Sequence, residues 1–288
     1  MMACKKARTS QGERHEDHRR QVHIWSKAVV PTSGLHRKVA KFTAEELLKE
    51  MDEAGIDAAL IHPPSGWDPD ANGLAIEAAQ KYPQRFAVMG QFPLDHPENR
   101  KLVRGWRQQP GMMGLRWPLL LEAQQKWLYD GSLEWLWPAA EREGLPIAMM
   151  GGLFLPKFRE IAERYPNLKM ILDHCGLNRR GQDAAAFIHL DELVALAKLP
   201  NVAVKATGAP HYSTLGYPYP NIQDGLHRIF DAFGPKRFFF GTDITRMPCS
   251  YRQCVNFFTE ELAWLKGREL EDVMGRGLCE WIGWEYRF

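Results

Sequence analysis

The sequence is poor in cysteine, and the cysteines that it has form no pattern. They are odd in number and scattered, and no two make a Cys-x-x-Cys pair: Cys4, Cys175, Cys249, Cys254 and Cys279. Neither a disulfide framework nor a cysteine-based structural zinc site is therefore indicated. Reduced thiols in a cytoplasmic protein are the simplest interpretation.

Other absences narrow the class of protein further. The chain has no run of roughly 18 apolar residues, so no transmembrane helix is expected. Its 37 basic and 35 acidic residues leave a formal charge of +2, which provides no long-range field for nucleic acid or an anionic membrane. No Gly-x-Gly-x-x-Gly follows a predicted strand and no Walker-type loop occurs, which weakens a nucleotide-binding interpretation.

The first twenty residues differ from the rest of the chain. Residues 1–20 hold six Lys/Arg, three acids and two His, with almost no apolar residue and no h-region of a secretory signal. We interpret them as a disordered or atypical N-terminal tail, or as the product of a shifted start or reading frame. Residues 21–288 then form a single domain, because a chain of 288 residues with 45% hydrophobic content lies in the size range of one α/β barrel.

A repeated unit runs through this domain: a short apolar strand, a polar loop, a helix with 3.6-residue apolar spacing, and a turn with Pro or Gly. Thr43-x-x-Glu46 is a capping box that begins one such helix, and Gly55 ends it. Strands recur every ~25–35 residues, as βαβ units require. We therefore predict a closed (β/α)₈ barrel of the TIM type, with an open doubly wound sheet as the alternative. The expected strands are Val22–Trp25, Ala58–His62, Phe86–Gln91, Met113–Trp117, Pro146–Met150, Lys169–His174, Val202–Ala206 and Phe238–Gly241.

Two of these strands end in polar groups and a glycine. Residues 237–243 place Gly241-Thr242-Asp243 after three aromatics, and residues 169–176 place Asp173-His174 at the end of an apolar run. A buried strand that ends in an unpaired charge costs free energy, so Asp243 needs a partner or a task, unless it is simply a helix N-cap. The C-terminal ends of barrel strands share one mouth, where active sites lie. The predicted rim consists of Gln21, His23, Trp25, His62, Arg116, Trp117, Met149, Met150, Asp173, His174, Lys205, Asp243 and Arg246.

Six segments carry a resemblance to a known family: residues 22–25, 51–57, 114–116, 171–176, 201–208 and 233–243. In this order they resemble the amidohydrolase-related superfamily. The resemblance is closest to its branch of small single-domain hydrolases, which includes the pyrone-dicarboxylate lactonases. It covers nearly the whole chain from residue 22, and it implies a metal-dependent-hydrolase-like barrel.

The family pattern also implies a metal site, from which this sequence departs in two places. The family opens with Asp-x-His-x-His on the first strand, and its two His can hold a divalent metal with a His of strand six and an Asp of strand eight. Gln21 stands where the first His is expected, and Met150 stands near the position of a strand-five His that many members have. His23, His174 and Asp243 remain as matching ligands, and three protein ligands plus water can form a catalytic zinc site. The resemblance thus implies either no cofactor or one divalent metal, zinc before others.

The same resemblance implies hydrolysis of a small carboxylated lactone or related cyclic ester, which this branch can perform without a metal. Asp243 would act as general base, with a pKa raised by partial desolvation, and His174 and His23 would hydrogen-bond the carbonyl and the oxyanion. The guanidinium fork of Arg116 suits a substrate carboxylate, although Lys205 could instead form a cross-barrel ion pair and Trp25 could simply pack. The further substrate-binding candidates are His62, Lys205, His211, Arg246 and Trp25.

Two other functions stay open. One is a metal-dependent decarboxylase of an aromatic or muconate-type acid, which also occurs in the superfamily but depends more on the missing ligands. The other is a barrel that binds a small acid without turning it over. In every case the expected partner is a small carboxylated molecule rather than nucleic acid or membrane, and a homo-oligomer is neither required nor excluded.

Overall fold

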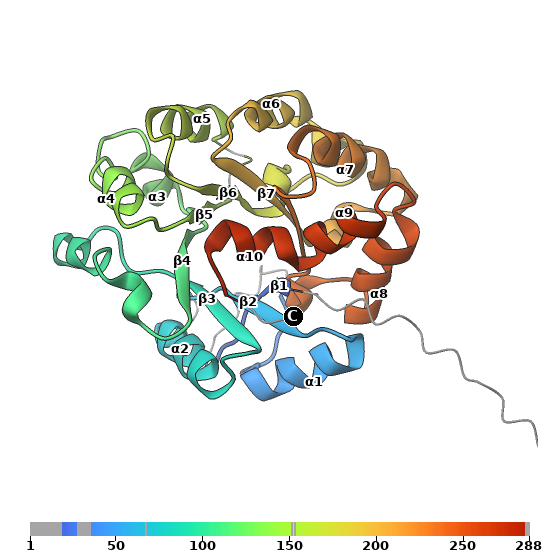
Figure 1. The fold of residues 1–288 in the computed structure, drawn as a ribbon, viewed down its shortest axis with the longest axis horizontal. Helices are drawn as coiled ribbons and strands as arrows, with labels where there is room; N and C mark the ends of the chain where they lie inside the picture. Colours follow the sequence, from blue (N-terminus) through green and yellow to red (C-terminus); the bar gives the residue numbers. More distant parts are fainter. Residues whose placement is uncertain (1–18, 28–35, 67, 151, 153, 286–288) are drawn as a thin grey trace, which may run out of the picture.

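The computed structural model describes residues 19–27, 36–66, 68–150, 152 and 154–285. Its centre is one parallel sheet whose strands follow one another in chain order, each hydrogen-bonded to the next (Figure 1). The strands are β1 (Arg19–Val22), β2 (Ala58–Ile61), β3 (Phe86–Gly90), β4 (Met112–Trp117), β5 (Ile147–Met149), β6 (Met170–Leu172), β7 (Val202–Thr207) and β8 (Phe238–Gly241). The sheet is curled and carries its helices on the outside, so the fold is of the TIM-type α/β class.

The helices alternate with the strands, as the repeated sequence unit predicts. They are α1 (Ala44–Ala54), α2 (Ala71–Lys81), α3 (Glu122–Lys126), α4 (Leu136–Arg142), α5 (Leu155–Arg164), α6 (Leu190–Ala195), α7 (Pro220–Phe233), α8 (Tyr251–Asn256), α9 (Gly267–Glu271) and α10 (Gly277–Ile282). The predicted capping box of α1 is confirmed. The Thr43 hydroxyl accepts the Glu46 N–H at 3.2 Å, the Glu46 carboxylate accepts the Thr43 N–H at 2.7 Å, and Gly55 ends the helix at φ 73°.

Seven of the eight predicted strands are confirmed to within two residues at each end, but the first is wrong. We expected Val22–Trp25, whereas the ladder pairs Arg19–Val22 with Ala58–Ile61. Ladder hydrogen bonds come from the backbone and do not require apolar side chains, so the charged start of this strand looked like part of the tail. Trp25 has already left the sheet and forms an isolated antiparallel bridge with Phe42. Of the predicted tail at 1–20, residues 1–18 lie outside the described residues, and 19–20 belong to β1.

The barrel interior is apolar and is covered at one end by α10. Inward-facing residues of six strands pack with Leu278, Cys279 and Ile282 of α10 in one buried cluster. The start of α10 lies against Pro235 and Lys236, which precede β8, and the Lys169 ammonium, just before β6, donates to the Trp281 carbonyl at 2.9 Å. Helix α10 therefore covers the N-terminal ends of the strands, and it crosses the centre of the ring in Figure 1. The C-terminal ends remain for a site.

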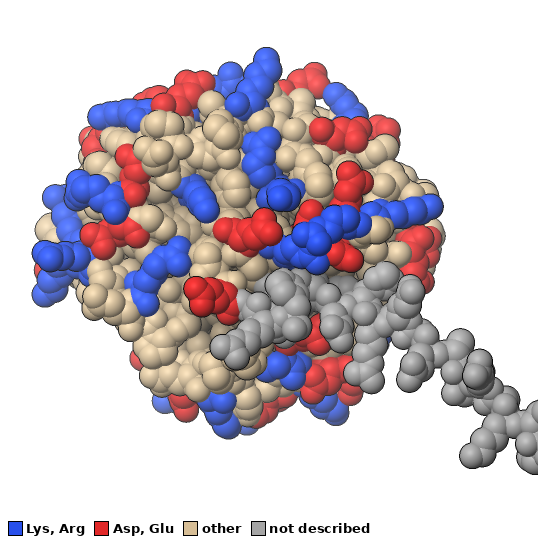
Figure 2. Space-filling view, in the orientation of Figure 1, with Lys and Arg blue, Asp and Glu red and all other residues tan. Residues whose placement is uncertain are grey.

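The outer surface carries both signs of charge. On the face drawn in Figure 2, Lys and Arg side chains are interspersed with Asp and Glu over the described surface, in keeping with the small net charge. None of the helices that the structure describes has the length and apolar character needed to cross a bilayer.

Candidate active site

The candidate active site forms around Asp243, directly after β8. Its carboxylate is 2% exposed. One oxygen, Oδ1, lies 3.3 Å from His23 Nε2 and 3.9 Å from His36 Nδ1. The other, Oδ2, lies 2.9 Å from Arg246 Nε and 4.0 Å from His174 Nε2. Four of these five residues are in the predicted site, and the structure brings all four together.

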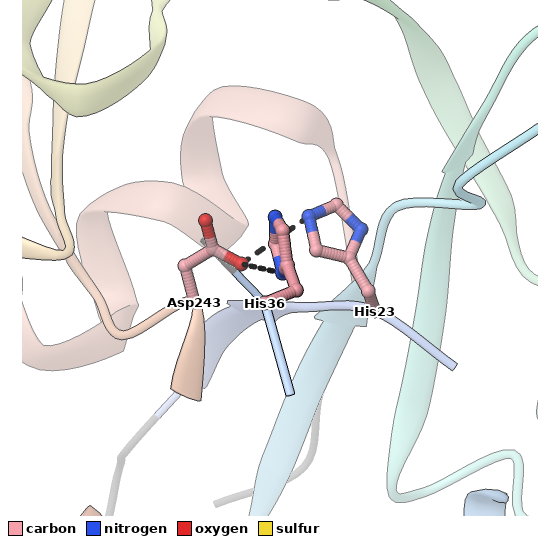
Figure 3. A group of neighbouring side chains, drawn as sticks. All are labelled: His23, His36 and Asp243. Carbon is pink, nitrogen blue, oxygen red and sulfur yellow. Dashed lines mark ion pairs between the residues drawn. The ribbon is translucent and has the colours of Figure 1, made fainter. Parts of the chain in front are cut away.

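The fifth residue, His36, was not predicted. It comes from the segment between β1 and α1, and Figure 3 shows its ring, the His23 ring and the Asp243 carboxylate turned toward one another. The donor atoms of these three residues lie within 4.8 Å of one another. The family pattern has no histidine at this position. The available signal was topological, because loops that follow barrel strands line the mouth.

Two residues of this site have a left-handed backbone. Asp243 has φ 53° and His174 has φ 54°, as does the neighbouring Cys175 at 52°. Such a conformation costs roughly 1–2 kcal/mol for a residue with a Cβ, and structures keep it where the surroundings impose it, commonly at functional sites. The strain falls on the two residues that follow β8 and β6, where it aims their side chains into the mouth.

Backbone carbonyls fix the protonation of two imidazoles. His174 Nδ1 lies 2.8 Å from the Thr207 carbonyl, and His23 Nδ1 lies 2.5 Å from the His62 carbonyl. A carbonyl oxygen can only accept, so we assign the ring proton to Nδ1 in both cases. Arg246 Nη2 is also 3.0 Å from His174 Nδ1, but both atoms are donors under this assignment, so we regard that contact as not hydrogen-bonded. The Nε2 lone pairs of both rings then face Asp243.

The electrostatics keep His174 and His36 neutral and Asp243 ionised. Burial, reinforced by Arg246, lowers the pKa of His174 to about 3, and burial lowers the pKa of His36 to about 3. Burial opposes ionisation of Asp243, but its neighbours hold its pKa well below the usual range: His23 and His36 when they carry a second proton, and Arg246 as a permanent cation. Our expectation of a raised Asp243 pKa is wrong. It considered the effect of burial on the carboxylate and left out the effect of the neighbouring charged side chains.

This donor set fits a divalent cation. A carboxylate oxygen and an imidazole lone pair both only accept, so their close approach is favourable only with a proton or a cation between them. Metal-binding histidines commonly donate their other ring N–H to a backbone carbonyl, as His23 and His174 do here. Two imidazoles, one carboxylate and an open position match catalytic zinc sites.

A second group of buried charged side chains surrounds Asp173, the residue before His174. Asp173 Oδ1 lies 2.7 Å from Lys205 Nζ, and Asp173 Oδ2 accepts Arg116 Nε at 2.7 Å. His62 Nε2 lies 3.0 Å from Lys205 Nζ, and its carbonyl is the one that holds His23. Burial alone would raise the pKa of Asp173, but Lys205 and Arg116 hold this pKa below its usual range. The cross-barrel ion pair considered for Lys205 is therefore present.

Ion pairing limits what these residues can offer a substrate. Lys205 is fully buried, and burial lowers its pKa to about 8, so it stays mainly charged at neutral pH beside Asp173. Burial and Lys205 lower the pKa of His62 well below its usual value, which makes it a neutral acceptor. Within the described residues, the terminal nitrogens of Arg116 make no hydrogen bond, because Asp173 takes only Nε. Arg116 thus keeps two donors for an anion.

Two other predicted residues lie at the margin of the site. His211, in the 3₁₀ turn Ala209–Tyr212, is half-buried, and burial lowers its pKa to about 4. Trp25 is 1% exposed, its ring lies 5.6 Å from that of Phe42, and its indole N–H donates to the Val39 carbonyl at 3.0 Å. These are packing contacts, so substrate binding by Trp25 stays a prediction that no observed contact supports.

Comparison with known proteins identifies the family. A sequence profile described as Amidohydrolase matches residues 8–276, most of the chain. The chain belongs to the amidohydrolase family. It is 27% identical over 164 residues to the L-fucono-1,5-lactonase of Burkholderia ambifaria, an alignment that covers 54% of each chain, so the match spans about half the length of that relative.

Solved structures resemble this amidohydrolase in fold. An amidohydrolase from Burkholderia multivorans with bound zinc has a TM-score of 0.76 at 20% identity, covering 92% of this chain and 99% of that one. A protein described as a 2-pyrone-4,6-dicarboxylic acid hydrolase from Acinetobacter baumannii, with citric acid bound, has 0.69 at 15%, covering 93% and 100%. The 5-carboxyvanillate decarboxylase of Sphingomonas paucimobilis has 0.61 at 17%, covering 85% and 84%. At these identities the likeness shows the fold alone.

The buried group of this amidohydrolase gives a stability prediction. Lys205→Met leaves Asp173 with Arg116 as its one cationic partner, and we expect the free energy of unfolding to fall by about 3–5 kcal/mol. Asp173→Asn/Lys205→Met should lose less than the sum of the two single variants, with a coupling energy of about 1–3 kcal/mol. Urea denaturation of the unmodified protein, the two single variants and the double variant measures this coupling energy. The exposed pair Asp191–Arg228, at 3.0 Å, is the matched control, expected to couple by less than about 1 kcal/mol. Strict additivity at Asp173 and Lys205 would contradict the interpretation.

Proposed function

We propose that this amidohydrolase hydrolyses a small carboxylated lactone or a related cyclic ester. The observation that carries the proposal is the buried mouth group, where, among the residues that the structure describes, Arg116, Lys205 and Arg246 pair with the two carboxylates of Asp173 and Asp243. One positive charge is left uncompensated, and burying it is costly unless an anion binds. The L-fucono-1,5-lactonase relative and the structure described as a 2-pyrone-4,6-dicarboxylic acid hydrolase, with its bound citric acid, support this substrate class.

We also infer that the sheet is a fully closed (β/α)₈ barrel. Strands β1 and β8 are the two ends of the pairing order, and the residues just beyond them, His23 and Asp243, approach to 3.3 Å. Closure brings side chains from both ends of the sheet into one mouth. The proposed active site depends on that arrangement, because it draws on residues at the ends of β1, β6 and β8.

In the proposed reaction, Asp243 accepts the proton of the water that attacks the lactone carbonyl. The cationic partners that lower its pKa also weaken it as a base, so the water needs further activation. The neutral His174 carries its proton on Nδ1, toward the Thr207 carbonyl, and has none at Nε2 to donate to an oxyanion, and the Nδ1 of His23 likewise faces a carbonyl, that of His62. The terminal nitrogens of Arg116 carry positive charge and can bind the substrate carboxylate. Asp173 accepts a hydrogen bond from Arg116 Nε and so fixes the plane of the Arg116 guanidinium.

The missing activation is what a divalent metal supplies, since a bound metal lowers the pKa of water and polarises a carbonyl. His23 and Asp243 would hold it, with His174 as the third ligand in the site predicted from sequence. The zinc-bound structure from Burkholderia multivorans supports zinc for a fold of this kind. We propose that His23 and His174 act as ligands or ligand neighbours rather than as oxyanion donors.

Decarboxylation of an aromatic acid is the second candidate. The uncompensated cationic charge would hold the carboxylate of such an acid equally well, and the likeness to 5-carboxyvanillate decarboxylase supports it. The products separate the two functions. A lactonase forms an acid from a neutral ester and releases a proton, whereas a decarboxylase releases carbon dioxide and consumes one. A barrel that only binds would do neither.

The test is a substrate screen in weakly buffered indicator solution, with zinc added or chelator present. The substrates are sugar-acid lactones, a pyrone dicarboxylic acid and hydroxylated aromatic acids. We expect acidification with a lactone, and Asp243→Asn should reduce kcat by about 10²–10⁴-fold because the general base is lost.

The control for this variant is Asp191→Asn on α6, a surface carboxylate that also pairs with an arginine, and it should keep full activity. Circular dichroism and the melting temperature verify that both variants are folded. Full activity of folded Asp243→Asn would contradict the role of Asp243. Carbon dioxide release without acidification would replace the lactonase with the decarboxylase.

A further inference from the structure

We propose that His36 is the third ligand of a divalent metal site in this protein, with His23 and Asp243, and that His174 lies outside that site. The role of this metal in catalysis rests on the proposed function. The metal site itself does not, because the test below measures metal binding without substrate. His36 belongs to no expected ligand set of this chain. It comes from the segment that leads from β1 into α1 (Figure 3).

The spacing of the three donors suits a small cation. Donor atoms about 2.1 Å from a tetrahedral zinc ion lie roughly 3.4 Å apart. His23 Nε2 and His36 Nδ1 lie 3.3 and 3.9 Å from the same oxygen of Asp243, and all three donor atoms fit within 4.8 Å. The rings of His23 and His36 meet edge to face, with centroids 5.3 Å apart, so both can face one ion without stacking.

The backbone around His36 holds it in this position. The Arg37 N–H donates to the Thr245 carbonyl at 2.6 Å, which fixes the backbone beside His36. The Thr245 hydroxyl lies 2.8 Å from His36 Nδ1, the atom that would bind the metal, so this contact would be given up when the metal binds. Thr245 lies in the 3₁₀ turn Ile244–Arg246, which begins directly after Asp243. The turn that presents the carboxylate therefore also anchors the segment that presents the imidazole, and the two donors are positioned together.

The two oxygens of Asp243 differ in charge environment, which decides between His36 and His174. Arg246 Nε lies 2.9 Å from Oδ2, and Arg246 Nη2 lies 3.0 Å from His174 Nδ1. The guanidinium is thus a permanent cation beside Oδ2 and the His174 ring, where it would repel a second cation. Oδ1 lies on the side of His23 and His36, so the metal should bind there.

The experiment compares zinc binding by His36→Ala, His174→Ala and a control, His227→Ala, whose side chain is exposed on α7 and pairs with Asp231. The full chain is stripped with chelator, reloaded and analysed for metal content. Zinc affinity follows from competition with a chromophoric chelator, and cobalt spectra report coordination. We expect His36→Ala to weaken zinc binding by at least about 100-fold, and His174→Ala by less than about 10-fold. His227→Ala should match the unmodified protein.

Other outcomes overturn the proposal. These are loss of zinc in His174→Ala with retention in His36→Ala, equal affinity in all variants, or no zinc binding by the unmodified chain. His36→Asp keeps a ligand and should recover part of the affinity, which separates ligation from a folding defect. Because no substrate is involved, zinc binding can be confirmed even if every lactone fails. A chain that binds no zinc and still opens a lactone would refute this inference and leave the proposed function standing.

A separate observation, on two cysteines outside the proposed metal site, points to a thiol modification site. Cys249 Sγ and Cys254 Sγ lie 3.4 Å apart, at the residue before the N-cap of α8 and within its first turns. Cys249 is partly exposed, while Cys175 is buried with its pKa raised by burial. Hydrogen bonds from Cys254 and then Tyr219 lower the pKa of Cys249 to about 7, although burial opposes them. We infer that Cys249 and Cys254 form a reversible disulfide on exposure to a hydroperoxide.

The chemistry balances with the peroxide as oxidant. The Cys249 thiolate attacks the O–O bond, so an S–O bond forms and the leaving alkoxide or hydroxide takes a proton. The Cys254 sulfur then attacks the sulfenic acid, the S–S bond forms, and the S–O bond breaks as hydroxide leaves with the Cys254 proton as water. Both sulfurs are oxidised, and the peroxide is reduced to an alcohol or water.

Alkylation and peptide mass spectrometry after a hydrogen peroxide series test this inference. We expect a peptide with Cys249 joined to Cys254, reversed by dithiothreitol and formed at least about 10-fold faster than any oxidation of buried Cys279. Cys254→Ser should stop at a sulfenic acid on Cys249, which dimedone traps. Equal oxidation rates at Cys249 and Cys279, or no cross-linked peptide, would overturn it.

Discussion

The charge of Asp243 is the constraint on which the rest of this structure depends. The aromatic run of β8 carries the carboxylate to a position that is 2% exposed, where an unpaired ion would cost several kcal/mol. Its partners come from distant parts of the chain: His23 after β1, His36 before α1, and His174 after β6. A curled sheet that brings the residues after β1, β6 and β8 close together supplies these partners.

Asp173 is a second buried carboxylate, and it too needs charged partners from distant strands. Lys205 of β7 and Arg116 of β4 neutralise it, and Lys205 also contacts His62 after β2. The His62 carbonyl in turn fixes the His23 ring. The two buried carboxylates are therefore connected through Lys205, His62 and the His23 ring, and the backbone carbonyl of His62 sets the tautomer of His23.

Much of this arrangement was predictable, because strand ends in a parallel barrel must share a mouth. Apolar runs ending in Asp173-His174 and Asp243 predicted which side chains would lie together at the strand ends, and Arg116 and Lys205 followed from their strands. Three features depended on tertiary contacts. The β1 ladder uses backbone groups of charged residues, so apolar patterning misplaced it. His36 is positioned by Thr245, which is distant in sequence. The direction of the Asp243 pKa depends on how many cations and imidazoles converge, which no local pattern records.

The tautomers decide what kind of catalyst this arrangement can be. A metal-free lactonase needs proton donors aimed at the developing oxyanion. The one ring proton of His174 is directed at the Thr207 carbonyl, and the lowered pKa of His174 means that the ring does not take up a second proton at neutral pH. What remains beside Asp243 is a set of lone pairs, which bind a cation but cannot stabilise an anion. The positive charge that the chemistry requires must then come from the guanidinium groups or from a bound metal. Arg246 already pairs with Oδ2, so a bound cation is favoured at Oδ1, beside His23 and His36.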